Sequence, residues 1–455
     1  MVFSSLTFLY LFLPLVLVTY FLFPARYRNF LLLLASLAFY AWGEPRYLFL
    51  MLFSTIFDFF IAQLVYRYRQ QRLAKRFFVG LSLAVNLGLL GFFKYAGFLS
   101  GTLNDVFHLD LAITQLALPI GISFYTFQTL SYTLDVARGQ IQPQRSFLKL
   151  ATYITLFPQL IAGPIVRYAD IEDQLSQRTS SWLRSYSGLQ RFIIGLGKKV
   201  LLANQVGLLW QEVQLLPSSE MSFFTAWLGI IAFGLQIYFD FSGYSDMAIG
   251  LGRIFGFDFL ENFNFPYISQ SISEFWRRWH ISLGTWFREY VYIPLGGNRV
   301  GRWQEIRNLA IVWFLTGFWH GANWNFILWG LYFGVIIIIE KHFLSQWLQR
   351  RSRWLRHLYT LILLAFGWVL FSFEDLSQVW TYSSWLLNPF ATTLINQHSL
   401  FYLFHFGPLL LVSAILATPL RQKIPMTLPL LIIILLLVTA YLVDASFNPF
   451  LYFRF

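Results

Sequence analysis

The residues best suited to chemistry lie in the segment LTGFWHGANWNFILWG, residues 315–330. It places His320 inside a long apolar run. Ionisable side chains are costly within a membrane and usually line a pathway or a site. Helical spacing puts Gly317 one turn before the ring, and Gly321 follows it, so we expect open space beside the imidazole. We interpret His320 as a candidate catalytic residue; the alternative is a histidine that only hydrogen-bonds a neighbouring helix.

A second candidate segment is SISEFWRRWHISLGTWFREYVYIPLGGNR, residues 271–299. Drawn as one helix, it has an aromatic face beside a cationic stripe, with His280 on the border. The aromatic face contains Trp276, Trp279, Leu283, Trp286, Phe287 and Tyr290, and the stripe contains Arg277, His280, Gly284 and Arg288. Such a helix suits the cytoplasmic interface, where arginines meet phosphates. The alternative is a basic helix that only anchors the chain to anionic lipid.

Other kinds of site are not indicated. The chain has no cysteine, and its seven histidines show no metal-binding spacing, so we expect no metal. Phosphate-binding loops and nucleophile elbows are also missing from the sequence. Asp240 and Asp246 are six residues apart and so lie on different helical faces, which favours pairing with an arginine over acid–base catalysis. Close helix packing at Ser242 and Gly243 is expected beside them.

The elements that position these residues are membrane helices. Of the 455 residues 57% are hydrophobic and 12% are charged, which predicts an all-α polytopic membrane protein with about ten or eleven spans. The net charge of +12 gathers in short loops between apolar stretches, as expected for cytoplasmic loops and not for nucleic-acid binding. We therefore expect a multi-pass membrane protein.

Charge in the loops predicts the topology. Five basic residues in 67–76 place that loop in the cytoplasm, and counting spans from it puts both termini outside. The polar stretch 167–191 remains unassigned to a side. Residues 309–339 are too few for two full spans and predict a bent hairpin, broken at 317–325 at membrane depth, that carries His320.

We expect one membrane domain, 1–455. Within it, residues 274–308 form the cytoplasmic-interface amphipathic segment, 309–339 the broken hairpin and 446–455 an external aromatic tail. The simplest role for this tail is an aromatic belt at the membrane interface. Alternatively, Tyr452 could turn back towards the site and take part in acyl handover.

The chain resembles the membrane-bound O-acyltransferase family, and in particular its bacterial branch of alginate O-acetylases, peptidoglycan O-acetylation subunits and teichoic-acid D-alanyl transfer proteins. The resemblance rests on ISFYTFQTLSYTLDV, PQLIAGPIVRY, YFDFSGYSDMAIG, EFWRRWHISLGTWFREYVYIPLGGNR and GFWHGANWNFILWG, which are spread over most of the chain. It implies a funnel through the membrane. The catalytic histidine of the family falls on His320, and its second hallmark position falls on His280.

The resemblance also implies a reaction. An acyl group, most simply acetyl from acetyl-coenzyme A, would pass to a hydroxyl with His320 as general base and without a bound cofactor. Candidates for binding the donor phosphates are Arg277, Arg278 and Arg288, with His280 beside them. Asn323 is a candidate for orienting His320 or stabilising the oxyanion, and Trp319 and Trp276 are expected to line the site.

Members of this branch work with an external SGNH-type esterase-like partner that completes transfer to a polysaccharide. The resemblance therefore implies that this chain moves the acyl group across the membrane, and we hypothesise that Tyr452 carries it transiently. A transporter or flippase is the alternative function, and a non-catalytic scaffold is a third. The sequence does not identify the acceptor polysaccharide.

Overall fold

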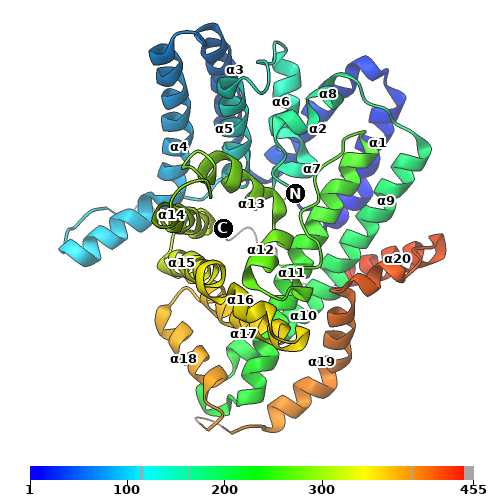
Figure 1. The fold of residues 1–455 in the computed structure, drawn as a ribbon. Helices are drawn as coiled ribbons and strands as arrows, with labels where there is room; N and C mark the ends of the chain where they lie inside the picture. The colour runs from blue at the N-terminus through cyan, green and yellow to red at the C-terminus, as the bar shows by residue number, and fades with distance from the viewer. Residues whose placement is uncertain (113–115, 162, 391–392, 445–455) are drawn as a thin grey trace. The chain divides into compact units, whose positions relative to one another are not determined.

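The computed structural model describes residues 1–112, 116–161, 163–390 and 393–444. Every named element in these ranges is a helix (Figure 1). Seven of the helices are long and apolar enough to cross a membrane, and two shorter apolar helices accompany them. This confirms the predicted all-α polytopic class, and the chain is a multi-pass membrane protein.

The helices divide into two compact units, with boundaries inside α9 (Trp182–Gly197), inside α11 (Phe223–Ile254) and after Leu260. The first unit holds α1 (Leu13–Leu22), α2 (Arg28–Gly43), α3 (Leu48–Arg67), α4 (Arg72–Phe107), α5 (Ile122–Arg138), α6 (Phe147–Thr155), α7 (Phe157–Leu160) and α8 (Tyr168–Ser176). The second unit holds α10 (Asn204–Leu215), α12 (Ile272–Arg278), α13 (Ile281–Phe287), α14 (Arg302–His320), α15 (Trp324–Ile339), α16 (Ser345–Gln349), α17 (Arg353–Ser372), α18 (Leu376–Leu387), α19 (Gln397–Leu416) and α20 (Leu428–Asp444).

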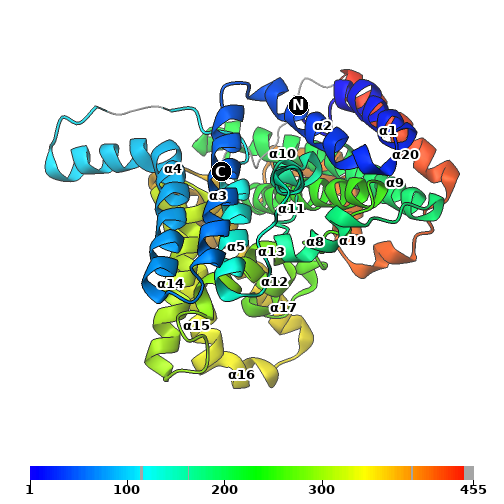
Figure 2. The ribbon, with the colours of Figure 1, turned by 90° about the horizontal axis from the view of Figure 1, so that it is seen from above.

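In the first unit α3, α4 and α5 lie side by side (Figure 1; Figure 2). A buried carboxylate joins them, because Asp58 accepts hydrogen bonds from Ser82 at 2.6 Å, Asn86 at 2.6 Å and Thr133 at 3.1 Å. A buried charge is tolerated only where such donors replace water. The three helices are therefore held in register by polar contacts as well as by apolar packing.

The polar stretch 167–191, left unassigned from the sequence, packs within the same unit. Arg178 donates to Asn29 at 2.6 Å, and Arg28 donates to Ser180 at 3.3 Å. Lys149 donates to Ser176 at 2.9 Å. These contacts place the middle of the stretch, residues 176–180, beside the segments around Arg28 and Lys149.

The aspartates of α11 have the structural roles that their spacing indicated. Asp246 pairs with Arg191 at 2.9 Å within the first unit, as predicted, whereas Asp240 pairs with Lys199 at 2.6 Å within the second. A Cβ on Gly243 would lie 2.7 Å from the carbonyl oxygen of Gly195, so this glycine is needed for close helix packing.

Candidate active site

His320 is the last residue of α14, and only residues 321–323 separate it from α15. The helix break thus falls inside the range 317–325 that the span count indicated. The two helices pack closely because a Cβ on Gly317 would overlap the carbonyl oxygen of Phe326, and one on Gly330 would overlap that of Trp313. A Cβ on Gly321 would overlap the Phe326 ring.

The expectation of open space beside the His320 ring is therefore wrong. The space beside Gly317 is filled by the backbone of α15, and the space beside Gly321 is filled by an aromatic ring. Helical spacing could not reveal this, since both neighbours come from a helix that the sequence pattern alone does not place against these positions.

Aromatic rings surround His320, which is only 3% exposed. Its centroid lies 4.9 Å from that of Trp329, 5.1 Å from Trp319 and 5.5 Å from Phe371, and all three rings meet it edge to face. Phe371 belongs to α17, so three helices contribute to the enclosure. These rings shield the imidazole from solvent.

His280 is held in a different way. The single helix predicted through this segment is wrong: α12 ends at Arg278, α13 begins at Ile281, and His280 lies between them in the left-handed region with φ 46°. Histidine tolerates this conformation better than most residues but still at a cost. The predicted cationic stripe is broken at the same point, since the His280 side chain is buried and not at the border of an interfacial helix.

Asn262 explains the break. Its side-chain oxygen accepts hydrogen bonds from the Ser282 backbone N–H at 3.2 Å and the Ser282 hydroxyl at 2.9 Å, and lies 3.1 Å from His280 Nδ1. Its carbonyl accepts from the Ile281 N–H at 3.0 Å. These bonds replace the intrahelical bonds lost at the break. Burial lowers the pKa of His280 to about 3, so the ring is neutral at physiological pH.

The two histidines meet through one tryptophan. The Trp319 ring lies 5.1 Å from His320 and 6.0 Å from His280, and Phe241 packs edge to face on His280 at 4.7 Å. The structure thus gathers His320, His280 and Trp319 in one buried cluster. A change at His280 can reach the His320 ring by displacing Trp319.

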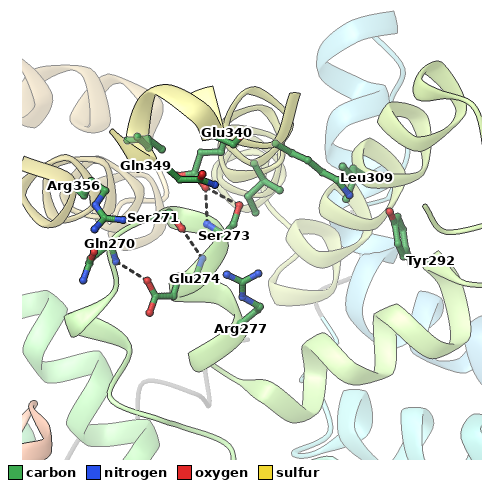
Figure 3. Close-up of a pocket in the computed structure, with 14 residues that line it drawn as sticks. Gln270, Ser271, Ser273, Glu274, Arg277, Tyr292, Leu309, Glu340, Gln349 and Arg356 are labelled. Atoms are coloured by element: carbon green, nitrogen blue, oxygen red, sulfur yellow. Dashed lines mark hydrogen bonds between the residues drawn. The ribbon is translucent and has the colours of Figure 1, made fainter. Parts of the chain in front are cut away.

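Trp276 links this cluster to an open pocket. Its ring, on α12, lies 5.3 Å from Trp329, which in turn packs on His320. The next residue, Arg277, lines a pocket of about 670 Å³ (Figure 3). A single turn of α12 therefore borders both the pocket and the aromatic enclosure of the histidine.

The pocket is built around the beginning of α12. Glu340 accepts hydrogen bonds from the Ser273 backbone N–H at 2.8 Å and the Ser273 hydroxyl at 2.6 Å (Figure 3). It also accepts from the backbone N–H of Ile272 at 2.7 Å. Its carboxylate thereby satisfies helix N–H groups that have no partner within the helix. Since Glu340 follows directly on α15, it fixes α12 to the hairpin that carries His320.

The basic side chains of the pocket differ in whether an acidic partner pairs with them. Lys341 donates to Glu305, and this hydrogen bond holds the pKa of Glu305 below its ordinary value. Arg277 and Arg356 also line the pocket and form no ion pair with any described residue. The sequence did not indicate a functional role for Glu340 or Lys341, because charged residues that follow an apolar stretch are typical of the cytoplasmic end of a membrane span.

The three predicted arginines have different surroundings. Arg277 lines the pocket, whereas Arg278 pairs with Glu274 at 3.0 Å and Arg288 pairs with Glu289 at 3.3 Å. Arg288 is well exposed and does not line this pocket. Only one of the three is thus placed beside the other pocket residues.

The two asparagines after His320 also differ. Asn323 is half-buried at the start of α15, and its side chain makes no capping hydrogen bond there. Asn325 is fully buried and donates to the Leu370 carbonyl at 3.2 Å, so it anchors the turn to α17. Tyr452 and the aromatic tail 446–455 lie outside the described residues.

A buried histidine in an aromatic enclosure, joined through Trp329 and Trp276 to a polar pocket lined by arginines, is an arrangement suited to acyl transfer. The profile of the family described as MBOAT, membrane-bound O-acyltransferase, matches residues 136–357, which include His280, His320 and all the described residues that line the pocket. The chain belongs to the membrane-bound O-acyltransferase family. It is an O-acetyltransferase.

Among its relatives, the probable alginate O-acetylase AlgI of Azotobacter vinelandii is 46% identical over 384 residues, or 84% of this chain and 77% of that protein. The peptidoglycan O-acetyltransferase of Helicobacter pylori is 36% identical, covering 83% of this chain and 78% of its own. The teichoic acid D-alanyltransferase of Bacillus subtilis is 28% identical, with 52% and 62% covered. These comparisons confirm the family and the branch that the motifs indicated.

Proposed function

We propose that this chain transfers acetyl from acetyl-coenzyme A in the cytoplasm to a hydroxyl on the other side of the membrane, for O-acetylation of an extracytoplasmic polysaccharide. One observation carries the proposal: the buried His320 ring is joined, through Trp329 and Trp276, to a pocket lined by Arg277. The names of the alginate and peptidoglycan relatives support a polysaccharide as the final acceptor.

The pocket supports a thioester donor with a phosphorylated end. Arg277 and Arg356 offer guanidinium groups of the kind that bind phosphate oxygens in pairs. Lys341 beside them adds positive charge, although Glu305 already pairs with it. In this proposal the phosphates of the donor bind here, and its flexible arm reaches past Trp276 to the histidine.

His320 acts as general base in the proposed reaction. An imidazole nitrogen takes the proton of the attacking hydroxyl while the hydroxyl oxygen bonds to the carbonyl carbon of the acetyl group. The C–S bond then breaks, and the departing thiolate takes the proton back from the imidazolium. Such proton transfer is worth about 10² to 10⁴ in rate. Asn323 at the turn is our candidate for stabilising the oxyanion, and His280 with Trp319 holds the ring in place.

The attacking hydroxyl belongs either to an external acceptor or to a carrier. We propose Tyr452 as that carrier, since the chain has no cysteine and the C-terminal tail is expected outside. An external SGNH-type partner would complete transfer to the polysaccharide. In this arrangement the enzyme lies in the bacterial inner membrane with its C-terminus outside.

Reconstituted protein tests the proposal. Proteoliposomes holding the wild type, His320→Ala or Tyr452→Phe would receive labelled acetyl-coenzyme A on the cytoplasmic face, and acetyl groups appearing on the opposite face would be measured. We expect the alanine variant to lose transfer. Full activity of this variant would contradict the catalytic role of His320, and passage of intact donor would favour a transporter or flippase. Unaltered acetylation by Tyr452→Phe would rule out the carrier.

Donor binding needs its own control. Arg277→Gln should raise KM for the donor about five- to tenfold with little change in kcat, as expected for one lost charged contact. Arg353→Gln removes the same charge from an exposed position that does not line the pocket, and should leave KM unchanged. Equal effects of both substitutions would show that bulk charge, not the pocket, attracts the donor.

A further inference from the structure

A second pocket, of about 420 Å³, lies in the first unit, away in sequence from the histidine cluster. Three separate segments form it, and they meet around four cationic side chains: Arg26, Arg28, Lys149 and Arg178. No carboxylate lines it. Within the described residues none of the four cations forms an ion pair.

The basic side chains are held in place by neutral partners. Arg178 donates to Asn29 at 2.6 Å, Arg28 to Ser180 at 3.3 Å and Lys149 to Ser176 at 2.9 Å. None of these partners neutralises a charge. The arginines are therefore held in fixed orientations, which costs side-chain conformational entropy, and their positive charge remains uncompensated.

Aromatic rings support two of the guanidinium groups. The guanidinium carbon of Arg28 lies 4.9 Å from the centre of the Tyr20 ring, and that of Arg178 lies 4.6 Å from the centre of the Phe257 ring. Because each ring contacts the face of its guanidinium, the N–H groups at the edge are left for other partners. Burial and, to a smaller extent, the charge of Arg28 lower the pKa of Arg178. Two like charges thus share a partly buried space, which is unfavourable unless an anion joins them.

A nearby carboxylate does not serve this purpose. Asp258 is close in the fold, because its backbone N–H donates to Gln174 at 2.8 Å, yet its carboxylate pairs with Arg184 at 2.8 Å. Asp258 could have neutralised a charge in the pocket, but its carboxylate is engaged with Arg184. This pattern is typical of a binding site for an external anion.

Exposed apolar side chains flank the pocket. Leu22, at the end of α1, is 77% exposed, and Phe30, at the beginning of α2, is 47% exposed. Trp182, at the start of α9, is 86% exposed. Basic pockets at the border between polar loops and apolar helix surface bind the head groups of anionic phospholipids in many membrane proteins.

We propose that Arg26, Arg28, Lys149 and Arg178 form a binding site for a phosphate group, most directly that of an anionic phospholipid whose acyl chains cover the adjoining apolar surface. A free phosphate or pyrophosphate has the same chemistry. Guanidinium groups suit all three, since their paired N–H donors match two phosphate oxygens. This site does not touch the acyl-transfer chemistry and stands independently of the proposed function.

The test compares two variants of the full-length protein with equal loss of charge. Arg28→Gln/Arg178→Gln removes the two stacked arginines of the pocket, whereas Arg69→Gln/Arg72→Gln removes two arginines of the same unit outside it. Retention of phosphatidylglycerol and of phosphatidylcholine would be measured by native mass spectrometry after exchange into neutral detergent. In a parallel arm, inorganic phosphate and pyrophosphate would be titrated calorimetrically.

We expect the wild type to retain phosphatidylglycerol over phosphatidylcholine, the pocket variant to bind it about 25-fold more weakly and the control pair to match the wild type. Binding of soluble phosphate that depends on the same arginines would support the site with the free anion as its ligand. Equal loss in both variants, or no loss in the pocket variant, would overturn the proposal. The exposed single variant Arg26→Gln, expected to weaken binding about fivefold, decides the matter should the double variant fail to fold.

Discussion

His280 and His320 lie on either side of the same tryptophan but owe their positions to different forces. His280 depends on hydrogen bonds to Asn262 and on a strained, left-handed backbone. His320 has an ordinary helical backbone and is enclosed by aromatic rings and by a glycine contact between two helices. The left-handed backbone at His280 costs stability in order to hold one conformation, whereas the helical backbone at His320 carries no such strain. The comparison suggests that His320 performs the chemistry and His280 positions it.

The largest effect should separate the two rings directly. His320→Gln is expected to lower kcat by about 10² to 10⁴ while the melting temperature stays close to that of the wild type, because the amide lacks the base but fills much of the space. The control is His280→Asn, which suits a left-handed backbone and should lose much less activity. Acetyl transfer in proteoliposomes and thermal melts in detergent provide the measurements. A larger activity loss at His280 would reverse the assignment.

The glycine contact behind His320 can be broken next. Gly317→Ala places a methyl group against the Phe326 carbonyl and should cost about 3 kcal/mol in the free energy of unfolding, at the upper end for overpacking. Chemical denaturation in detergent would measure it. Gly284→Ala is a suitable control, since a Cβ there meets no atom within 4 Å. Equal stability of the two variants would show that the α14–α15 contact is not tight.

The hydrogen bonds behind His280 are expected to contribute somewhat less. Asn262→Ala leaves the Ser282 donors without their acceptor and should cost about 2 kcal/mol in the free energy of unfolding. Activity should fall with it, because Trp319 loses its support from His280. If Asn262→Ala lowers the free energy of unfolding but leaves kcat at saturating donor unchanged, the link through Trp319 is not needed for catalysis.

The smallest effect is a dependence of stability on pH. The folded-state pKa of His280 is about 3, below the ordinary 6.5, so the unfolded chain binds the extra proton first as pH falls. Stability from this group is complete well above pH 6.5 and declines towards pH 3, by roughly 1 kcal/mol at pH 5.5. Comparing melts of the wild type and His280→Asn between pH 7 and 5.5 isolates the contribution. Identical pH profiles would contradict a neutral, buried His280.

The sequence predicts the elements better than it predicts their contacts. Long apolar stretches and short basic loops identify the membrane helices, and the span count locates the break after His320, because both depend on local composition. The break at His280 depends on Asn262, which lies 18 residues away and offers no local signal. Gly317 was correctly seen as important but for the wrong reason, since its neighbour comes from another helix.

The candidate site shows the same limit. The family motifs single out His320 and His280, whereas Glu340 carries no motif and is recognised only through its bonds to α12. Arg288 was grouped with Arg277 by helical spacing, and Arg278 was a candidate for the same donor-binding role. They separate in the structure because each has an acidic partner of its own.

The bonds of Asn262 also bear on the order of folding. Together with the bond from the Asn264 N–H to the Arg278 carbonyl at 2.9 Å, they close residues 262–281 into a loop through contacts made within the loop itself. Closing so short a loop costs little entropy. Since synthesis proceeds from the N-terminus, this loop can form before α14 leaves the ribosome. His280 would then already be in place when Trp319 and His320 arrive to pack against it.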